Sequence, residues 1–281
     1  MNAAVDQLSQ AQRERLAFLE MRAYFTGELR RADIEARFGI KPAASSRDLS
    51  AYRDLEPSNL DYDVAARCYR PSKAFKPIFE FSSERVLAWL LQGFGDGLEL
   101  KLRKAAPCEG PGNLVRPDLA ILSTVTRAMC ARRAIKVSYL SMSSGAANRE
   151  LVPVALADNG LRWHVRAYCE KHKDYRDFVL SRFRGVPDFN GESEFTATQD
   201  SEWNSQVTIR LQPDTRLSIA QQQIIAHDYG MINQELAVTT KAPLVGYLLQ
   251  AFNIDHRKLE ISPTAQQIVI GNYDEIKGYL F

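Results

Sequence analysis

Long apolar runs are missing from this chain of 281 residues, although 45% of its residues are hydrophobic. No stretch approaches the roughly 20 consecutive apolar residues that a membrane-spanning helix needs. Residues 1–12 also lack the apolar core of a secretory signal. The sequence therefore predicts a cytoplasmic protein without a membrane partner. Its length suits two or three domains, each able to bury its own core.

Cysteine is scarce, with four in the chain. They are Cys68, Cys108, Cys130 and Cys169. The sequence has no Cys-x-x-Cys pair, and no histidine lies at zinc-finger spacing from a cysteine. We therefore expect free, mostly buried thiols and no bound metal.

Catalytic signatures are absent too. The sequence has no Gly-x-Ser-x-Gly, His-Glu-x-x-His or P-loop motif, and no acidic cluster with magnesium-site spacing. Gly93, Gly95 and Gly97 alternate as in a phosphate loop, but no Lys-Ser/Thr follows, so a flexible turn is the better interpretation. His164 and Cys169 fall on opposite faces of one predicted strand, so they are not a nucleophile pair. We predict that the protein is not an enzyme and needs no cofactor.

A basic strand is present near the middle of the chain. Residues 161–169 alternate, with apolar side chains at the odd positions. The even positions carry Arg162, His164, Arg166 and Tyr168. Residues 162–184 hold seven Lys or Arg and three acids, a local excess of +4 in a chain of net charge +2. A half-buried strand with an inert solvated face gives the same pattern. Arg, His and Tyr make planar and bidentate contacts, however, which favours an anion-binding face.

The first 79 residues are predicted to begin with a helix-turn-helix. Gln10 to Phe25 has the apolar period of a helix, and Arg30 to Phe38 forms a second helix closed by Gly39. Pro42 suits the first position of a third helix that runs to about Leu55. Two helices joined by a short turn with glycine are typical of the helix-turn-helix.

The third predicted helix has an inner and an outer face. Ser45, Leu49 and Tyr52 lie on the inner face, while the outer face is small and polar. A predicted β-hairpin over 60–70 then supplies the wing. The residues predicted to contact DNA are Ala43, Ser46, Arg47, Ser50, Arg67, Arg70 and Lys73. Residues 1–76 hold thirteen basic and eleven acidic residues, so positive charge for phosphate must be local. A small helical interaction domain is the alternative.

The rest of the chain is predicted to divide by composition. Residues 188–204 are polar and contain no Lys or Arg, which is typical of a connecting loop. After them strands and helices alternate, which favours a small α+β domain. The predicted segments are a winged helix-turn-helix (1–79), a helical linker (80–116), a ligand-sensing domain (117–187), a connecting loop (188–205) and a C-terminal α+β extension (206–281).

Four stretches, 135–139, 149–153, 160–168 and 178–183, together resemble the WYL domain of bacterial transcription regulators. The Trp-Tyr-Leu triplet that names this domain reads Trp163-His164-Val165 here, as in the defence-associated BrxR/CapW subgroup. The resemblance implies a small SH3-like (Sm-like) β-barrel with a ligand pocket. It implies that the pocket is lined by Tyr139, Ser141, His164, Arg166 and Arg182.

Together these features predict an α+β multidomain protein that acts as a homodimeric, sequence-specific repressor on an inverted-repeat operator in double-stranded DNA. The resemblance implies a phosphate-bearing effector, such as a nucleotide, a cyclic oligonucleotide or a short nucleic acid. It also implies a phage-defence gene cluster as target, and a C-terminal extension that serves dimerisation or gating. The main alternative is an accessory protein whose barrel binds single-stranded nucleic acid constitutively. A structural scaffold is a third possibility.

Overall fold

The computed structural model describes residues 5, 7–92, 115–255 and 262–280. The glycine triplet at 93–97, the predicted linker at 105–112 and Cys108 lie outside these residues. The chain divides into two compact units, 1–153 with 167–194 and 154–166 with 195–281. None of the described helices is long and apolar enough to cross a lipid bilayer.

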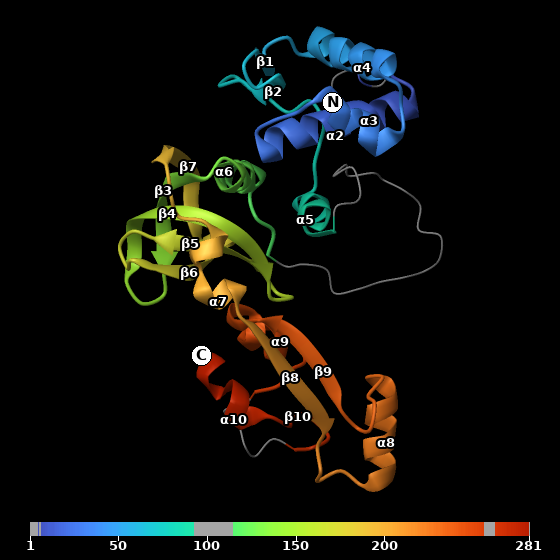
Figure 1. Cartoon of the computed structure of the whole chain (residues 1–281), viewed down its shortest axis with the longest axis vertical. Coiled ribbons are helices and arrows are strands. Elements are labelled where there is room, and N and C mark those ends of the chain that lie inside the picture. The colour runs from blue at the N-terminus through green and yellow to red at the C-terminus, as the bar shows by residue number, and fades with distance from the viewer. Residues whose placement is uncertain (1–4, 6, 93–114, 256–261, 281) are drawn as a thin grey trace. The chain divides into compact units, whose positions relative to one another are not determined.

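The first unit begins with the three helices expected from the sequence (Figure 1). They are α2 (Gln10–Thr26), α3 (Arg31–Phe38) and α4 (Pro42–Leu55). Gly39 joins α3 to α4 with φ 63°, a left-handed conformation that glycine adopts at no steric cost. Pro42 occupies the first turn of α4, where its missing N–H is not needed. The helix-turn-helix is therefore confirmed.

A β-hairpin follows the three helices and forms the wing. It consists of β1 (Leu60–Asp63) and β2 (Cys68–Pro71), which pair antiparallel, and it is followed by α5 (Ser83–Gln92). Leu29 adds a short bridge to Tyr69, so the hairpin is hydrogen-bonded to the segment between α2 and α3. The N-terminal region is a winged helix-turn-helix.

The middle of the chain forms a helix and a five-stranded sheet. The helix is α6 (Leu119–Cys130), and the strands are β3 (Arg133–Ser141), β4 (Gly145–Asp158), β5 (Trp163–Cys169), β6 (Asp174–Val179) and β7 (Phe183–Glu192), with a short 3-10 helix η1 (Leu180–Arg182) before β7. The strand order is β6-β5-β4-β3-β7. Among the described residues no pairing joins β6 to β7, so the closed SH3-like barrel stays a prediction.

Residues 188–204 are more ordered than the predicted connecting loop. Strand β7 continues to Glu192, with Asp188 opposite Lys136 and Glu192 opposite Arg133 on β3. Two short helices follow, η2 (Ala197–Gln199) and α7 (Ser201–Asn204). The end of β7 lies at an edge of the sheet and is mostly exposed, so its polar sequence carried no alternation from which to predict a strand.

The C-terminal region confirms the predicted alternation of strands and helices. Its elements are β8 (Gln206–Pro213), α8 (Ile219–Asp228), β9 (Leu236–Lys241), η3 (Ala242–Leu244), α9 (Val245–Ala251), β10 (Ile268–Ile270), α10 (Tyr273–Ile276) and η4 (Lys277–Tyr279). The strands form an antiparallel sheet of order β10-β8-β9. Alternate residues of β8 point into the core, among them Val207, Ile209 and Leu211. With three residues, β10 is too short to give a periodic signal.

Candidate functional site

The two faces of α4 are as the sequence predicts. Ser45, Leu49 and Tyr52 are buried against the domain. On the other face Ala43, Arg47 and Ser50 are exposed and Ser46 is half-buried. The small polar face is therefore open to a partner.

Glu35 and Ser45 depart from the usual helix-turn-helix pattern, which places a small residue at the first position and an apolar one at the second. In the structure these two residues pair with each other. The Ser45 hydroxyl donates to Glu35 Oε1 at 2.7 Å and to the Pro42 carbonyl at 3.0 Å. One departure thus provides the hydrogen-bond partner for the other, and the motif retains its geometry.

A cavity of about 370 Å³, which we call the recognition groove, lies between α4 and the wing. Its lining is Arg31, Ser46, Leu49, Ser50, Arg53, Tyr62, Arg67 and Tyr69. The charged lining residues are all arginines, so the groove is positive where phosphates would approach. Arg31 also donates to the Ser46 hydroxyl at 3.1 Å. The rings of Tyr62 and Tyr69 lie 4.9 Å apart.

Sequence reasoning found only part of this groove. It predicted Ser46, Ser50 and Arg67, and it missed Arg31 and Arg53. Arg53 had a usable signal, because it follows Ser46 and Ser50 at helical spacing on the same face of α4. Arg31 lies on α3, and only the tertiary fold brings it to the groove.

Four predicted DNA contacts are not part of the groove lining: Ala43 and Arg47, which are exposed on the outer face of α4, and Arg70 and Lys73. Arg70 neighbours Tyr69 on the strand and therefore points to the other face of the hairpin. Its Nε lies 3.0 Å from Asp63 Oδ2. The Ala66 N–H and the Arg70 guanidinium together lower the pKa of Asp63. Lys73 is exposed beyond the end of β2. The roles of Arg70 and Lys73 in DNA binding stay predictions.

A buried glutamate of α2 contacts the inner face of α4. Glu20 on α2 is fully buried and accepts the Tyr52 hydroxyl at 2.6 Å. It also accepts the backbone N–H groups of Ile78 at 3.0 Å and Phe79 at 2.9 Å, in the segment that leaves the wing. Asn59 donates to the Tyr52 oxygen at 2.9 Å. Burial raises the pKa of Glu20 to about 7, against the opposing effect of these hydrogen bonds.

An ion pair adds to this anchoring. Arg15 on α2 contacts both carboxylate oxygens of Asp48 on α4, at 2.7 and 3.1 Å. Asp48 is buried, and the bidentate geometry restricts rotation of α4 on α2. The outer face of α4 is thus presented by a rigid support.

Three of the predicted effector residues lie in the first unit. Tyr139 is buried between the rings of Phe178 and Phe183, and its hydroxyl accepts the Val179 N–H at 3.1 Å. Ser141 bonds within the turn at 143–144, and Arg182 is half-buried in η1. Tyr139 therefore already has a structural role in packing β3 against β6 and β7.

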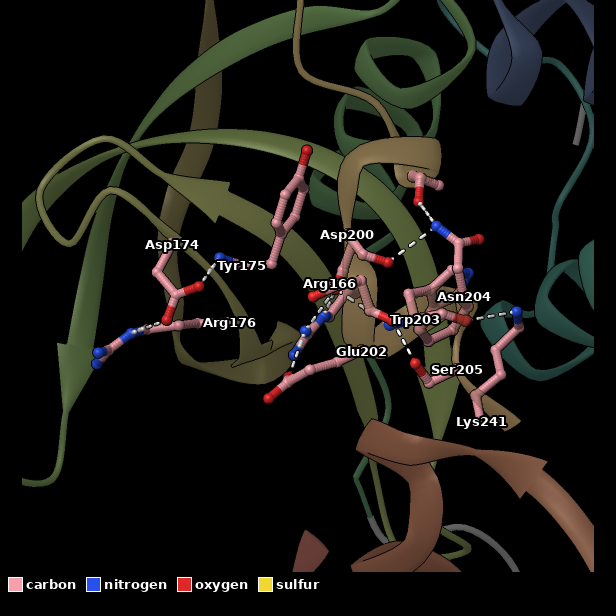
Figure 2. Close-up of polar contacts among 12 residues, drawn as sticks. Arg166, Asp174, Tyr175, Arg176, Asp200, Glu202, Trp203, Asn204, Ser205 and Lys241 are labelled. Atoms are coloured by element: carbon pink, nitrogen blue, oxygen red, sulfur yellow. Dashed lines mark hydrogen bonds and ion pairs between the residues drawn. The ribbon is translucent and has the colours of Figure 1, made fainter. Parts of the chain in front are cut away.

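The other two predicted effector residues, His164 and Arg166, lie on β5 and are buried, each 4% exposed. The His164 ring stacks on Tyr247 at 4.6 Å. Arg166 contacts Asp200 through two hydrogen bonds, at 2.6 and 3.0 Å, and Glu202 at 2.8 Å (Figure 2). The anion that this basic strand was expected to attract is supplied in part by the chain itself.

Asp200 and Glu202 come from the acidic stretch that was interpreted as a loop. Asp200 also caps α7 by accepting the Trp203 N–H at 3.1 Å. Lys241 of β9 contacts the same helix, donating to the Trp203 carbonyl at 2.7 Å, and its ammonium lies 5.0 Å from the Trp203 ring (Figure 2). Helix α7 is therefore held by Arg166 and by the C-terminal sheet. Among the described residues, no cluster of three or more metal-ligating side chains occurs.

Comparison with known families covers most of the chain. Residues 11–92 match the BrxR winged helix-turn-helix domain, residues 120–187 the WYL domain, and residues 206–276 the BrxR C-terminal dimerization domain. The Escherichia coli (strain KTE188) protein described as "DNA-binding transcriptional repressor CapW" is 36% identical over 96% of this chain and 92% of its own length. This chain belongs to the BrxR/CapW family of WYL-domain transcriptional regulators. The resemblance seen in the sequence is confirmed.

Other relatives extend the comparison. A Pseudomonas aeruginosa protein with the same description is 34% identical, again over 96% of this chain and 92% of its own length. Among solved structures, the proteasome accessory factor B/C of Arthrobacter aurescens aligns with 97% of this chain at 16% identity, with a TM-score of 0.29. This chain spans 46% of that protein's length. A likeness at that score carries no argument about function.

Proposed function

We propose that this member of the BrxR/CapW family is a homodimeric, sequence-specific DNA-binding repressor of a phage-defence gene cluster. A nucleotide or nucleic-acid effector that binds the WYL domain changes the affinity of the repressor for its operator. The observation that carries the first part is the recognition groove, with its arginines on α3, α4 and the wing. Relatives described as DNA-binding transcriptional repressors, aligned over nearly the whole chain, support it.

The outer face of α4 suits entry into a major groove. Its residues are small near the start of the helix, so the backbone can approach the bases closely, and Arg47 is long enough to reach a base edge or a phosphate. Arg67 on the wing and Arg53 at the end of α4 would then contact phosphates on either side.

Dimerisation follows from the C-terminal match to a dimerization domain. Two copies related by a two-fold axis present two α4 helices, so their operator is an inverted repeat with half-sites one or more helical turns apart. The positive charge is concentrated in the recognition groove, while the whole chain has a net charge of only +2. This distribution favours binding of DNA at one site over general attraction to DNA.

The effector is proposed to act by exchanging partners at Arg166. A phosphate group can replace Asp200 and Glu202 on the guanidinium, because both kinds of anion accept two parallel N–H bonds. The displaced segment leads directly into β8, and Lys241 ties it to β9. Binding of the effector would therefore move the segment that precedes β8 in the dimerization domain. That movement would favour a different distance between the two winged helices of the dimer.

The groove is tested by placing a carboxylate in it. We expect Ser50→Glu to weaken duplex operator binding at least about tenfold, because the new charge faces DNA phosphates. Ala11→Glu adds the same charge at an exposed position of α2 outside the groove, and it serves as the matched control. Fluorescence anisotropy with labelled operator measures both. Equal affinities for the two variants would contradict the proposed interface.

The alternative of constitutive single-strand binding is separated by the double variant His164→Ala, Arg166→Ala. Under the proposal it keeps operator binding and loses the response to effector. Loss of all nucleic-acid binding by a folded variant would support the alternative. Because both side chains are buried, circular dichroism of the variant must first show native helix content.

A further inference from the structure

A second cavity lies in the first unit and shares no lining residue with the recognition groove. Its volume is about 450 Å³, within the range of small-molecule sites. It is lined by the end of α2, by β2, by the end of α6, and by β3 and β7. The charged residues of this arginine cavity are Arg22, Arg70, Arg127, Arg133 and Glu28.

The positive charge of the arginine cavity is concentrated on two of its four arginines. Four arginines face one glutamate, and the C-terminal ends of α2 and α6 together add about one negative charge from their helix dipoles. A net positive charge remains. Arg22 contacts Asp33 at 3.0 Å and Arg70 contacts Asp63 at 3.0 Å, so these two are partly neutralised. Counting Asp33 and Asp63 brings the sum close to zero, and the two lining guanidiniums without a carboxylate partner among the described residues are those of Arg127 and Arg133.

Arg127 and Arg133 are held by aromatic rings instead of carboxylates. Both guanidiniums lie over the ring of Phe189, at 5.5 and 4.7 Å, and Arg127 also lies 5.9 Å from the ring of Tyr24. In the described part of the chain neither forms an ion pair with an acid, and Arg127 makes one long hydrogen bond, 3.4 Å, to the Ser123 carbonyl. Stacking fixes the plane of a guanidinium and leaves its N–H edge free to donate to two oxygens of an anion.

We propose that the arginine cavity is a ligand site for a nucleoside phosphate, separate from the site at Arg166. The phosphate oxygens take the N–H edges of Arg127 and Arg133, which match them in bidentate geometry. An inorganic ion would leave most of the cavity empty. The remaining volume beside the half-exposed ring of Phe189 suits a base and sugar.

Such a ligand would touch two domains at once. Arg22 and Arg70 belong to the winged helix, whereas Arg127, Arg133 and Phe189 belong to α6 and the five-stranded sheet. The contact between them is close at Gly27, where an added Cβ would lie 3.5 Å from Arg127. Binding would therefore favour the arrangement in which the two domains are in contact.

The test titrates the full-length protein with ADP, inorganic pyrophosphate and adenosine by isothermal calorimetry at low salt. We expect ADP to bind most tightly, pyrophosphate more weakly, and adenosine not measurably. Arg133→Gln should weaken ADP at least about tenfold, because a charge-assisted bidentate contact is lost. Arg133→Lys, which keeps the charge but not the fork, should give an intermediate loss. Arg132→Gln, the exposed neighbour outside the lining, is the matched control and should change affinity less than about twofold.

A second measurement needs no substitution. Cys130 is exposed and lines the arginine cavity, while Cys68 and Cys169 are buried. ADP should slow alkylation of Cys130 by a maleimide, followed by mass spectrometry of its peptide. Unchanged ADP affinity in Arg133→Gln, or an unprotected Cys130, would overturn the proposal. A loss of duplex operator affinity in Arg133→Gln without any ADP binding would also overturn it, and would assign the cavity to DNA. Failure of operator binding alone, with ADP still bound, would count only against the repressor function.

Discussion

The carboxyl group of Glu20 provides the sharpest quantitative test of how α4 is held. Its pKa of about 7 lies above the ordinary value of 4.5, because burial penalises the charged form more than the Tyr52, Ile78 and Phe79 donors stabilise it. A group whose pKa is raised by folding stabilises the fold below its unfolded pKa. That contribution is lost as pH rises through the folded pKa. For Glu20 the loss falls between about pH 4.5 and a little above pH 7.

The size of this effect follows from the shift. Each pKa unit corresponds to about 1.4 kcal/mol, so the contribution lost across this window is about 3 kcal/mol. Glu20→Gln has a similar shape and cannot ionise. We therefore expect the free energy of unfolding of the native protein, relative to that of the variant, to fall by about this amount from pH 4.5 to pH 8.

Carbon-13 NMR of the glutamate carboxyl groups measures the titration directly, with Glu20→Gln supplying the assignment. Glu56→Gln is the control: it removes a nearby charge that raises the Glu20 pKa only slightly, so the midpoint should stay near 7. A Glu20 midpoint below about 5 would refute the reasoning, because the Tyr52, Ile78 and Phe79 donors would then offset the penalty of burial and the predicted loss of stability with rising pH would not occur.

Three further predictions concern single side chains. Arg67→Gly removes a guanidinium from the wing. Arg67 has φ 51°, a backbone angle that glycine adopts freely, so the turn should persist. The slope of log operator affinity against log salt concentration, measured by fluorescence anisotropy, should fall by about one ion. Asp200→Asn should lower the free energy of unfolding by about 3 kcal/mol, because it breaks the buried pair with Arg166. Glu202→Gln should lower it by less than about 1 kcal/mol, because the Glu202 side chain is 64% exposed. Chemical denaturation compares the two variants, and equal losses would contradict the burial of the Arg166–Asp200 pair. Gly39→Ala should lower the free energy of unfolding by about 1 kcal/mol or more, because alanine disfavours the left-handed φ of this residue. A steric clash does not contribute, since nothing lies within 4 Å of the added Cβ. An unchanged melting temperature would contradict this prediction.

Local signals in the sequence predicted the winged helix well. Gly39 and Pro42 fix the turn between α3 and α4 through their own backbone restrictions, and the helical period separates the two faces of α4. These features depend on neighbours a few residues apart. The structure accordingly reproduces the predicted helix from Pro42 to Leu55.

Contacts between distant residues were not predictable in this way. Arg166 and Asp200 are 34 residues apart, and Tyr52 and Glu20 are 32 apart. Alternation along β5 predicted one buried and one open face, but residues 164–169 are all buried, and the sequence could not reveal that acids from 188–204 would cover the basic residue Arg166. The polar and acidic composition of that stretch, without Lys or Arg, made it resemble a loop, although its carboxylates complete a buried ion pair.

Selection of operators from a pool of random duplexes, using the full-length protein at moderate salt, tests the central claim most directly. The account predicts an enriched consensus made of two inverted half-sites separated by about one helical turn or a multiple of it, because two α4 helices of a dimer read the same sequence. Ser50→Glu should enrich no such consensus. If the native protein retains all duplexes equally, the assignment of the recognition groove as a reader of DNA sequence is contradicted.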